Sequence, residues 1–344
     1  MTDPQWELLL RIINGERLER PAVGFLVDGP WVAGINGIDL MDYFTDGRLW
    51  LEANLTAVRQ FPDVLWLPGF WAEFGMISNP PSFGTKCIWP EKGFPTCEPV
   101  IGSLDQIDSL KRPNVRTDGL LPFLLRRMKQ NQEAIEQAGH RIRFATSHGP
   151  LTIASYLVGH TEFLMGLRTD REACHRLIGL VTDFICDWLA VQKETFASID
   201  GILVLEDLMG FIGEDDFREF ALPYAQRIFA ALDVSVRFLH NDAYGLVTAR
   251  YLKQMNVNLF NFSFEHPIDE VRRLAGEEVT LMGNVPPRDV LAQGSCDDIQ
   301  RSVTELLHRV PDTRRLIVSA GGFTPPQFTS EKIAAFCQAV AGEV

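Results

Sequence analysis

The stretch Gly201-Ile202-Leu203-Val204-Leu205-Glu206 is a glycine and four aliphatic residues that end on a carboxylate. An unbroken apolar run of this length, without alternation, is typical of a parallel strand buried on both faces. Seven further short runs have the same character: Ala22–Val27, Val64–Leu67, Ile142–Thr146, Val234–His240, Leu259–Phe262, Val279–Met282 and Leu316–Ser319. Amphipathic segments separate these runs. The pattern predicts eight strand-then-helix units in a single α/β domain over residues 1–344, a (β/α)8 TIM-type barrel.

Two connections between the predicted strands are longer than a barrel needs. Residues 68–100, after the second strand, are rich in aromatic residues, proline and glycine, which is typical of a lid or a binding wall. Residues 148–200, after the third strand, contain two or three helical patterns in place of one. A doubly wound open sheet is the alternative fold, but no G-x-G-x-x-G motif follows the first strand.

Composition excludes several classes of protein. With 46% apolar and 22% charged residues the chain has the balance of a globular protein, and no apolar run approaches the ~18 residues needed to cross a bilayer. The net charge of -13 argues against nucleic acid or an anionic membrane as a partner. The N-terminus shows no signal-peptide pattern, and the six cysteines form no C-x-x-C motif, so we expect a reducing cytoplasm.

Polar residues follow the predicted strands, at the end of a barrel where reactive groups gather. Glu206 and His240 end neighbouring strands, which lie about 4.8 Å apart, so both side chains are expected to reach one ligand. A carboxylate and a neutral imidazole are suitable zinc ligands. The third ligand is either Glu219, on the following helix, or Asp242, which shares a strand face with His240.

Other residues at the strand ends are candidates for catalysis or substrate binding. His148, Asp207 and Asp242 are the candidate catalytic residues, and Trp71, Glu73 and Asn284 are the candidate substrate contacts. Aromatic residues of the long loop are expected either to line a site for an aromatic substrate or to pack the barrel mouth: Phe70, Trp71, Phe74, Trp89 and Phe94. Structural roles remain open as well, such as helix capping by His148 and a solvated helix face for Glu219.

Several short motifs, taken in order, resemble the uroporphyrinogen decarboxylase superfamily, and in particular its corrinoid-linked methyltransferase branch. The motifs are Ser147-His148-Gly149-Pro150-Leu151-Thr152, Glu206-Asp207, Phe217-Arg218-Glu219-Phe220, His240, Gly283-Asn284-Val285 and Ser319-Ala320-Gly321-Gly322. The resemblance covers nearly the whole chain and implies a (β/α)8 barrel. It also implies self-association as a homodimer.

Departures from the superfamily pattern narrow the expected chemistry. The decarboxylases carry arginines after the first strand to hold substrate carboxylates, whereas this chain has Val27-Asp28-Gly29-Pro30-Trp31. The thiol-methylating zinc enzymes use H-x-C and a later cysteine, whereas Asp242 and Gly321 or Gly322 stand at those places. Both substitutions disfavour the corresponding activities, because an acidic loop repels carboxylates and a site without thiolates is hard rather than soft.

The remaining motif is similar to that of the O-demethylase methyltransferases, whose zinc ligands are two glutamates and a histidine. Glu219 and His240 keep that family's spacing, with twenty residues between them (220–239), while Glu206 lies closer to Glu219 than in the family. The resemblance implies zinc held by Glu206, Glu219 and His240, a small-molecule methyl ether as donor, and a corrinoid protein as partner. The alternatives are a metal-free decarboxylase or lyase, with His240 and Asp242 handling protons, and a non-catalytic ligand-binding relative.

Overall fold

The computed structural model describes residues 1–91 and 93–342. All eight predicted strands are present, with ends within three residues of those expected. They are β1 (Ala22–Leu26), β2 (Leu65–Leu67), β5 (Phe144–His148), β6 (Gly201–Leu205), β7 (Val236–Asn241), β8 (Leu259–Phe262), β9 (Thr280–Val285) and β10 (Leu316–Ala320). No helix in the described ranges is long and apolar enough to cross a membrane.

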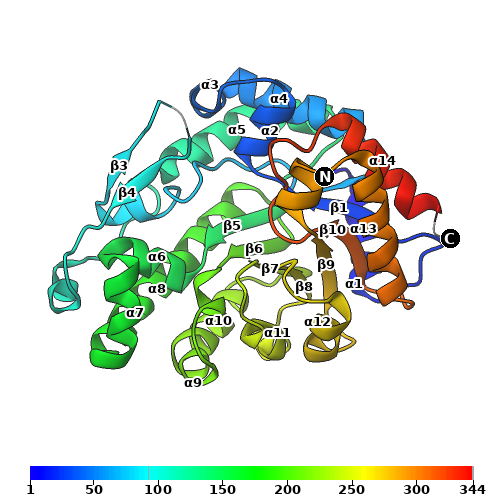
Figure 1. Cartoon of the computed structure of the whole chain (residues 1–344). Coiled ribbons are helices and arrows are strands. Elements are labelled where there is room, and N and C mark those ends of the chain that lie inside the picture. Colours follow the sequence, from blue (N-terminus) through cyan, green and yellow to red (C-terminus); the bar gives the residue numbers. More distant parts are fainter. Residues whose placement is uncertain (92, 343–344) are drawn as a thin grey trace.

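The eight strands form one parallel sheet in the order β2-β1-β10-β9-β8-β7-β6-β5, which curls on itself with helices on its outer face (Figure 1). Apart from β2 and β5, sheet strands that follow one another along the chain are therefore paired neighbours, as in a (β/α)8 barrel, and the predicted fold class is confirmed. Within the described residues no ladder joins β2 to β5. Side chains of Phe70, Trp71, Phe144 and Thr146 line a small cavity at this seam.

The outer layer is helical. Its helices are α2 (Gly29–Ile35), α3 (Leu40–Thr45), α4 (Gly47–Gln60), α5 (Leu121–Gln137), α6 (Pro150–Val158), α7 (His160–Thr169), α8 (Arg171–Thr195), α9 (Glu214–Asp216), α10 (Leu222–Phe229), α11 (Val247–Tyr251), α12 (Ile268–Ala275), α13 (Cys296–Arg309) and α14 (Ser330–Gly342). Short 3-10 turns are η1 (Pro80–Phe83), η2 (Leu104–Ser109) and η3 (Leu208–Gly210), and π-helical turns are η4 (Phe217–Ala221) and η5 (Pro287–Ala292).

The first helix, α1 (Asp3–Ile13), closes the N-terminal end of the barrel. It begins at a capping box of Thr2 and Gln5, and its side chains Trp6 and Leu9 belong to one apolar cluster with residues that point into the barrel. Trp6 meets Phe144 of β5 edge-on, with ring centroids 5.5 Å apart. Burying each large apolar side chain here contributes about 1.5–3 kcal/mol. The opposite end of the barrel, formed by the C-terminal ends of the strands, is left for chemistry.

Both predicted insertions are present. The segment 68–100 contains a two-stranded antiparallel hairpin, β3 (Lys86–Ile88) and β4 (Thr96–Glu98), which projects beside α6 (Figure 1). This hairpin was not predicted, because each strand has only three residues and no apolar run. After β5, the three helices α6, α7 and α8 stand in place of one, as the helical patterns of residues 148–200 indicate.

Candidate metal centre

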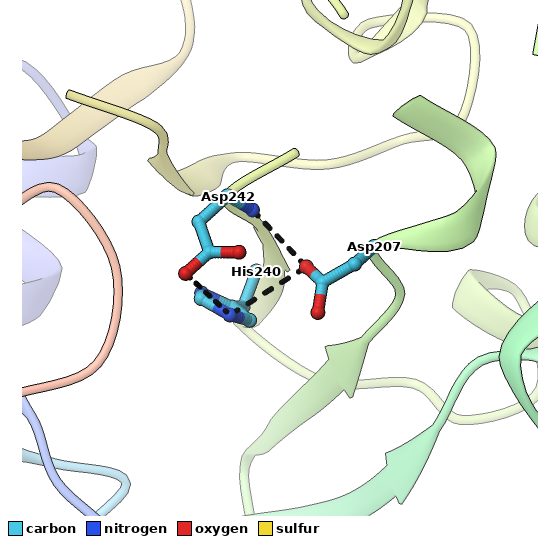
Figure 2. Close-up of side chains that lie close together, drawn as sticks. All are labelled: Asp207, His240 and Asp242. Carbon is cyan, nitrogen blue, oxygen red and sulfur yellow. Dashed lines mark hydrogen bonds and ion pairs between the residues drawn. The ribbon is translucent and has the colours of Figure 1, made fainter. Parts of the chain in front are cut away.

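Asp207, His240 and Asp242 meet at the C-terminal ends of β6 and β7 (Figure 2). The Nε2 atom of His240 lies 3.7 Å from Oδ1 of Asp207 and 3.9 Å from Oδ2 of Asp242. The backbone N–H of Asp242 donates to Oδ1 of Asp207 over 3.1 Å, which ties the two loops together. Two carboxylates and an imidazole thus present their ligand atoms to one point.

Strand geometry explains which residues meet. Leu203 and Leu205 of β6 point into the barrel, and side chains two residues apart share a face, so Asp207 also points inward. The ladder pairs Leu205 with His240, which brings the end of β6 level with the end of β7. His240 and Asp242 share a face for the same reason, as the sequence indicated.

Burial differs within this group. The side chain of His240 is only 1% exposed and lies edge-on to the ring of Phe323. The side chains of Asp207 and Asp242 are 43% and 39% exposed. The pKa of Asp207 is raised because the surrounding protein atoms penalise its charged form; His240 lowers this pKa and Asp242 raises it further. The carboxylates therefore face solvent while the imidazole is held rigidly beneath them.

A glycine makes room for Asp242. Gly322, which follows β10, has φ +126, and a Cβ atom built there would lie 2.5 Å from Oδ2 of Asp242. Any larger residue would be strained by the backbone and would displace the carboxylate. Gly322 is one of the two glycines that stand where thiol-methylating relatives are expected to have a cysteine, and the Asp242 carboxylate occupies the neighbouring space.

Residues 4–342 match the protein family of uroporphyrinogen decarboxylase (URO-D). The chain belongs to this family. A curated uroporphyrinogen decarboxylase of Myxococcus xanthus is 25% identical over 244 residues, which cover 69% of this chain and 67% of that protein. The methylated-thiol--coenzyme M methyltransferase of Methanosarcina mazei is 25% identical over 221 residues, which cover 64% of this chain and 53% of that protein. The chain thus aligns with about half the length of that methyltransferase.

A solved structure of a methyltransferase from Methanosarcina mazei superimposes with a TM-score of 0.79. The superposition covers 97% of each chain at 18% sequence identity, so the likeness is one of fold. The family match agrees with the superfamily expected from the sequence motifs, and the superposition agrees with the expected barrel. The proteins that this chain resembles thus include decarboxylases and methyltransferases, so fold alone does not identify the reaction.

The zinc ligands expected from the sequence, Glu206, Glu219 and His240, do not come together in the part of the chain that the structure describes. Glu206 directly precedes Asp207 and so points to the opposite face of β6, toward α6. It is fully buried, and Oε2 accepts the backbone N–H groups of Leu151 (2.8 Å) and Thr152 (3.0 Å), while Oε1 accepts the Thr152 hydroxyl (2.7 Å). Glu206 therefore caps the N-terminus of α6.

Replacing Glu206 by alanine is expected to destabilise the metal-free protein by about 3 kcal/mol, because two buried N–H groups of α6 lose their acceptor. The Glu206→Gln variant serves as the matched control. Its carbonyl can accept both N–H groups and its amide can donate to Thr152, so we expect a change below about 1 kcal/mol. Urea denaturation at pH 6 measures both. Equal stability of Glu206→Ala and wild type would contradict the capping role.

Glu219 is also removed from the site. It lies on η4 at the outside of the barrel, where Arg171 pairs with it and His175 Nε2 lies 3.1 Å from its Oε1. Its pKa is lowered, chiefly by the hydrogen bond from Arg171. The twenty-residue spacing to His240 matches the methyltransferase pattern, but the turn directs the side chain away from the strand ends.

His148 belongs to the barrel mouth. Its Nδ1 lies 2.9 Å from Oδ1 of Asn79, and that oxygen also accepts the backbone N–H of His148. Burial, reinforced by the nearby His240, lowers the pKa of His148 to about 4, so the imidazole is neutral at physiological pH. The capping role open to His148 is filled by Glu206.

The three expected substrate contacts have defined structural partners. Trp71 lies partly buried over the barrel interior and donates from Nε1 to the Val27 carbonyl over 3.2 Å. Glu73 is buried and accepts the backbone N–H groups of Gly29 (2.8 Å) and Gly75, so it joins the loops after β1 and β2. Asn284 donates to the His266 carbonyl over 2.7 Å and so joins the end of β9 to the loop after β8. Of these, Trp71 is only partly buried, and it lines a small cavity together with His148.

The other aromatic residues of the long loop mostly pack against protein. Phe70 meets Trp50 and His140, and Phe74 meets Phe44 and Trp89, all edge-on. Phe94 is 60% exposed in the hairpin loop. The packing role therefore accounts for the buried members of this set.

Sequence reasoning missed Asn261, whose Oδ1 lies 2.8 Å from Nδ1 of His240. A signal was available: Asn261 interrupts the otherwise apolar strand Leu259-Phe260-Asn261-Phe262. A polar side chain buried within such a strand must have hydrogen-bond partners, and it marks a position that serves another residue. Asn79, the partner of His148, lies in the long loop and carries no comparable signal.

Proposed function

We propose that this chain is a metal-dependent methyltransferase. Its reaction moves a methyl group from a small-molecule methyl ether, such as a methoxylated aromatic, to the cobalt of a corrinoid carried by a partner protein. The observation that supports this proposal best is the convergence of Asp207, His240 and Asp242 at the barrel mouth. Family membership and the fold shared with a solved methyltransferase are consistent with it.

The three residues fit a zinc ion by their chemistry. Carboxylate oxygens and a neutral imidazole nitrogen are zinc ligands, and three protein ligands with an open position are typical of a catalytic zinc site. The half-exposed carboxylates leave the solvent side free for such a position. We therefore propose Asp207, His240 and Asp242 as the zinc ligands. Compared with the set expected from the sequence, Asp207 and Asp242 take the places of Glu206 and Glu219, and His240 is retained.

A zinc ion held there would supply Lewis-acid catalysis, stabilising the negative charge that develops on an ether oxygen as its methyl group leaves. The chain's own residues bind and orient. Asp207 and Asp242 hold the two loops in one geometry through the Asp242 N–H. Trp71, which is only partly buried, is the candidate side chain for stacking against a methoxyarene. Precise placement of donor and acceptor then contributes much of the rate.

The electrostatics of the mouth disfavour decarboxylation of a polycarboxylate. Burial, with a smaller contribution from Glu73, raises the pKa of Asp28 to about 7, and burial also raises the pKa of Glu73. These carboxyl groups occupy the loops after β1 and β2, where decarboxylases are expected to have arginines. Carboxyl groups, whether charged or neutral, supply no positive charge that would attract an anionic substrate.

A metal-free lyase is the second candidate, because a histidine between two carboxylates can also carry protons. Metal analysis of protein purified without a histidine tag separates the two functions. We expect about one zinc per chain, or uptake of one zinc by the metal-free protein. Zinc far below one equivalent that added metal does not restore would reject the methyltransferase proposal and favour the lyase.

Incubation with methoxyarenes and a reduced corrinoid protein tests the activity itself. We expect methylcobalt to form, with its characteristic absorption spectrum, and to require zinc. A His240→Ala variant provides the matched negative control. If a broad panel of methyl ethers is bound but none yields methylcobalt, the chain is a ligand-binding relative instead.

A further inference from the structure

Asn261 lies beneath the candidate metal centre, fully buried on β8 and paired with His240 in the β7–β8 ladder. Its Nδ2 donates to the carbonyl of Met282 over 2.8 Å and to the carbonyl of Ala320 over 3.0 Å. These two acceptors belong to β9 and β10. One side chain therefore connects four neighbouring strands at the level of the site.

The two carbonyl partners determine how the amide is oriented. Carbonyl oxygens only accept hydrogen bonds, so the NH₂ group of Asn261 has to face Met282 and Ala320. The opposite orientation would place Oδ1 against two carbonyl oxygens in a buried environment, where lost hydrogen bonds are costly. Oδ1 is thereby directed at Nδ1 of His240, at 2.8 Å.

This orientation decides which nitrogen of His240 carries the proton. Because Oδ1 is only an acceptor, Nδ1 has to donate, and in a neutral imidazole the other nitrogen is then a bare acceptor. That nitrogen, Nε2, is 3.7 Å from Asp207 and 3.9 Å from Asp242. Both distances exceed the 2.7–3.2 Å of a direct N–H···O hydrogen bond. The carboxylates thus face Nε2 without a proton shared between them.

We propose that Asn261 is a positioning residue that locks His240 in the Nδ1–H tautomer and so makes Nε2 the metal-binding atom. The second half of this statement rests on the proposed metal-dependent function; the first half does not. Histidine ligands of metals commonly donate their other ring N–H to a fixed acceptor, and loss of that acceptor typically lowers metal affinity by about 10- to 100-fold.

The experiment uses the metal-free full-length protein with isotope-labelled histidine. Nitrogen NMR distinguishes a protonated ring nitrogen from a bare one, and the signals of His240 are assigned by their absence in His240→Ala. Zinc affinity is then measured by competition with a chelator. The test variant is Asn261→Ala, which removes the acceptor.

Asn54→Ala is the matched control for lost stability. Asn54 is also buried and donates from Nδ2 to two partners, Tyr43 and the Trp50 carbonyl, but it lies on α4 and touches no residue of the candidate centre. We expect it to leave both the tautomer and the zinc affinity unchanged.

For the wild type we expect a proton on Nδ1 and a bare Nε2. Asn261→Ala should show a mixture of tautomers and bind zinc about 10- to 100-fold more weakly. A wild-type proton on Nε2, or an unchanged tautomer in Asn261→Ala, would overturn the inference. A wild type with the expected tautomer but no zinc affinity would reject the proposed function and leave the tautomer assignment supported.

Discussion

Replacing Asp242 by asparagine is expected to lower the zinc affinity of this protein by about 100-fold or more, because the metal loses a charged ligand. Replacing Glu219 by glutamine is expected to leave the zinc affinity within about twofold of the wild-type value. Both changes remove one negative charge and keep the size of the side chain. They differ in place: Oδ2 of Asp242 lies 3.9 Å from Nε2 of His240, while Glu219 pairs with Arg171 and His175 on the outer surface.

Zinc competition titrations on the two purified variants measure this difference. Sequence spacing alone left Glu219 and Asp242 as alternative third ligands, so the pair of variants distinguishes them directly. Methyl transfer is expected to fall with zinc occupancy in Asp242→Asn and to stay near wild type in Glu219→Gln. The reverse order of affinities would refute the ligand set Asp207, His240 and Asp242.

The free energy of unfolding of the metal-free Asp28→Asn variant should exceed that of the wild type by an amount that grows as pH rises from 4 to 8. Asp28 caps α2 by accepting the Trp31 N–H over 3.2 Å. Burial, followed by repulsion from Glu73, raises the pKa of Asp28 from 3.8 to about 7. A carboxyl group whose pKa is raised on folding stabilises the folded state below its ordinary pKa. This stabilisation is lost as pH rises through the pKa of the folded state.

The size of the change in the free energy of unfolding follows from the rise in the pKa of Asp28. Asparagine also caps helices well and carries no charge, so Asp28→Asn keeps the cap and removes the ionisation. We expect the variant to exceed wild type in free energy of unfolding by about 2 kcal/mol at pH 5 and about 4 kcal/mol at pH 8. Urea denaturation in the presence of a chelator measures the difference at each pH.

Asp39→Asn is the matched control, because Asp39 caps the next helix, α3, by accepting the Met41 N–H over 2.8 Å at an exposed position. Its effect should stay below about 0.5 kcal/mol at both pH values. If the difference between Asp28→Asn and wild type stayed constant across this range, the buried carboxyl group of Asp28 would not be its source. Other groups also titrate in this range, since burial raises the pKa of Glu206 to about 7 and lowers that of His148 to about 4, but they are common to both proteins.

The strands were predictable because burial on both faces leaves a simple mark in the sequence. Each of the eight core strands is a short, nearly unbroken apolar run, such as Gly201–Leu205, and its sheet partner does not change that pattern. The hairpin of β3 and β4 has no such mark. Its three-residue strands alternate exposed and half-buried positions, and only their mutual pairing defines them.

The site was predictable in part, by the two-residue period of a strand. That period correctly grouped His240 with Asp242. Applied to β6, it would also have favoured Asp207 over Glu206, because Leu203 and Leu205 point inward and Glu206 is out of phase with them. Glu219 was favoured by its spacing alone, and spacing along the chain does not determine where a helical turn directs a side chain.

The amino-acid sequence by itself determined the barrel, the end of it that carries polar residues, and the hard, thiolate-free character of the candidate site. These properties depend on residue type and on periods of a few residues. Tertiary structure decided that Asp207 joins His240 and Asp242 at one point, and that Asn261 and Gly322 lie against them, because these residues belong to different strands or to the loops after them. It also decided that Glu206 caps a helix, since its partners Leu151 and Thr152 lie more than fifty residues away and meet it only when β5 pairs with β6.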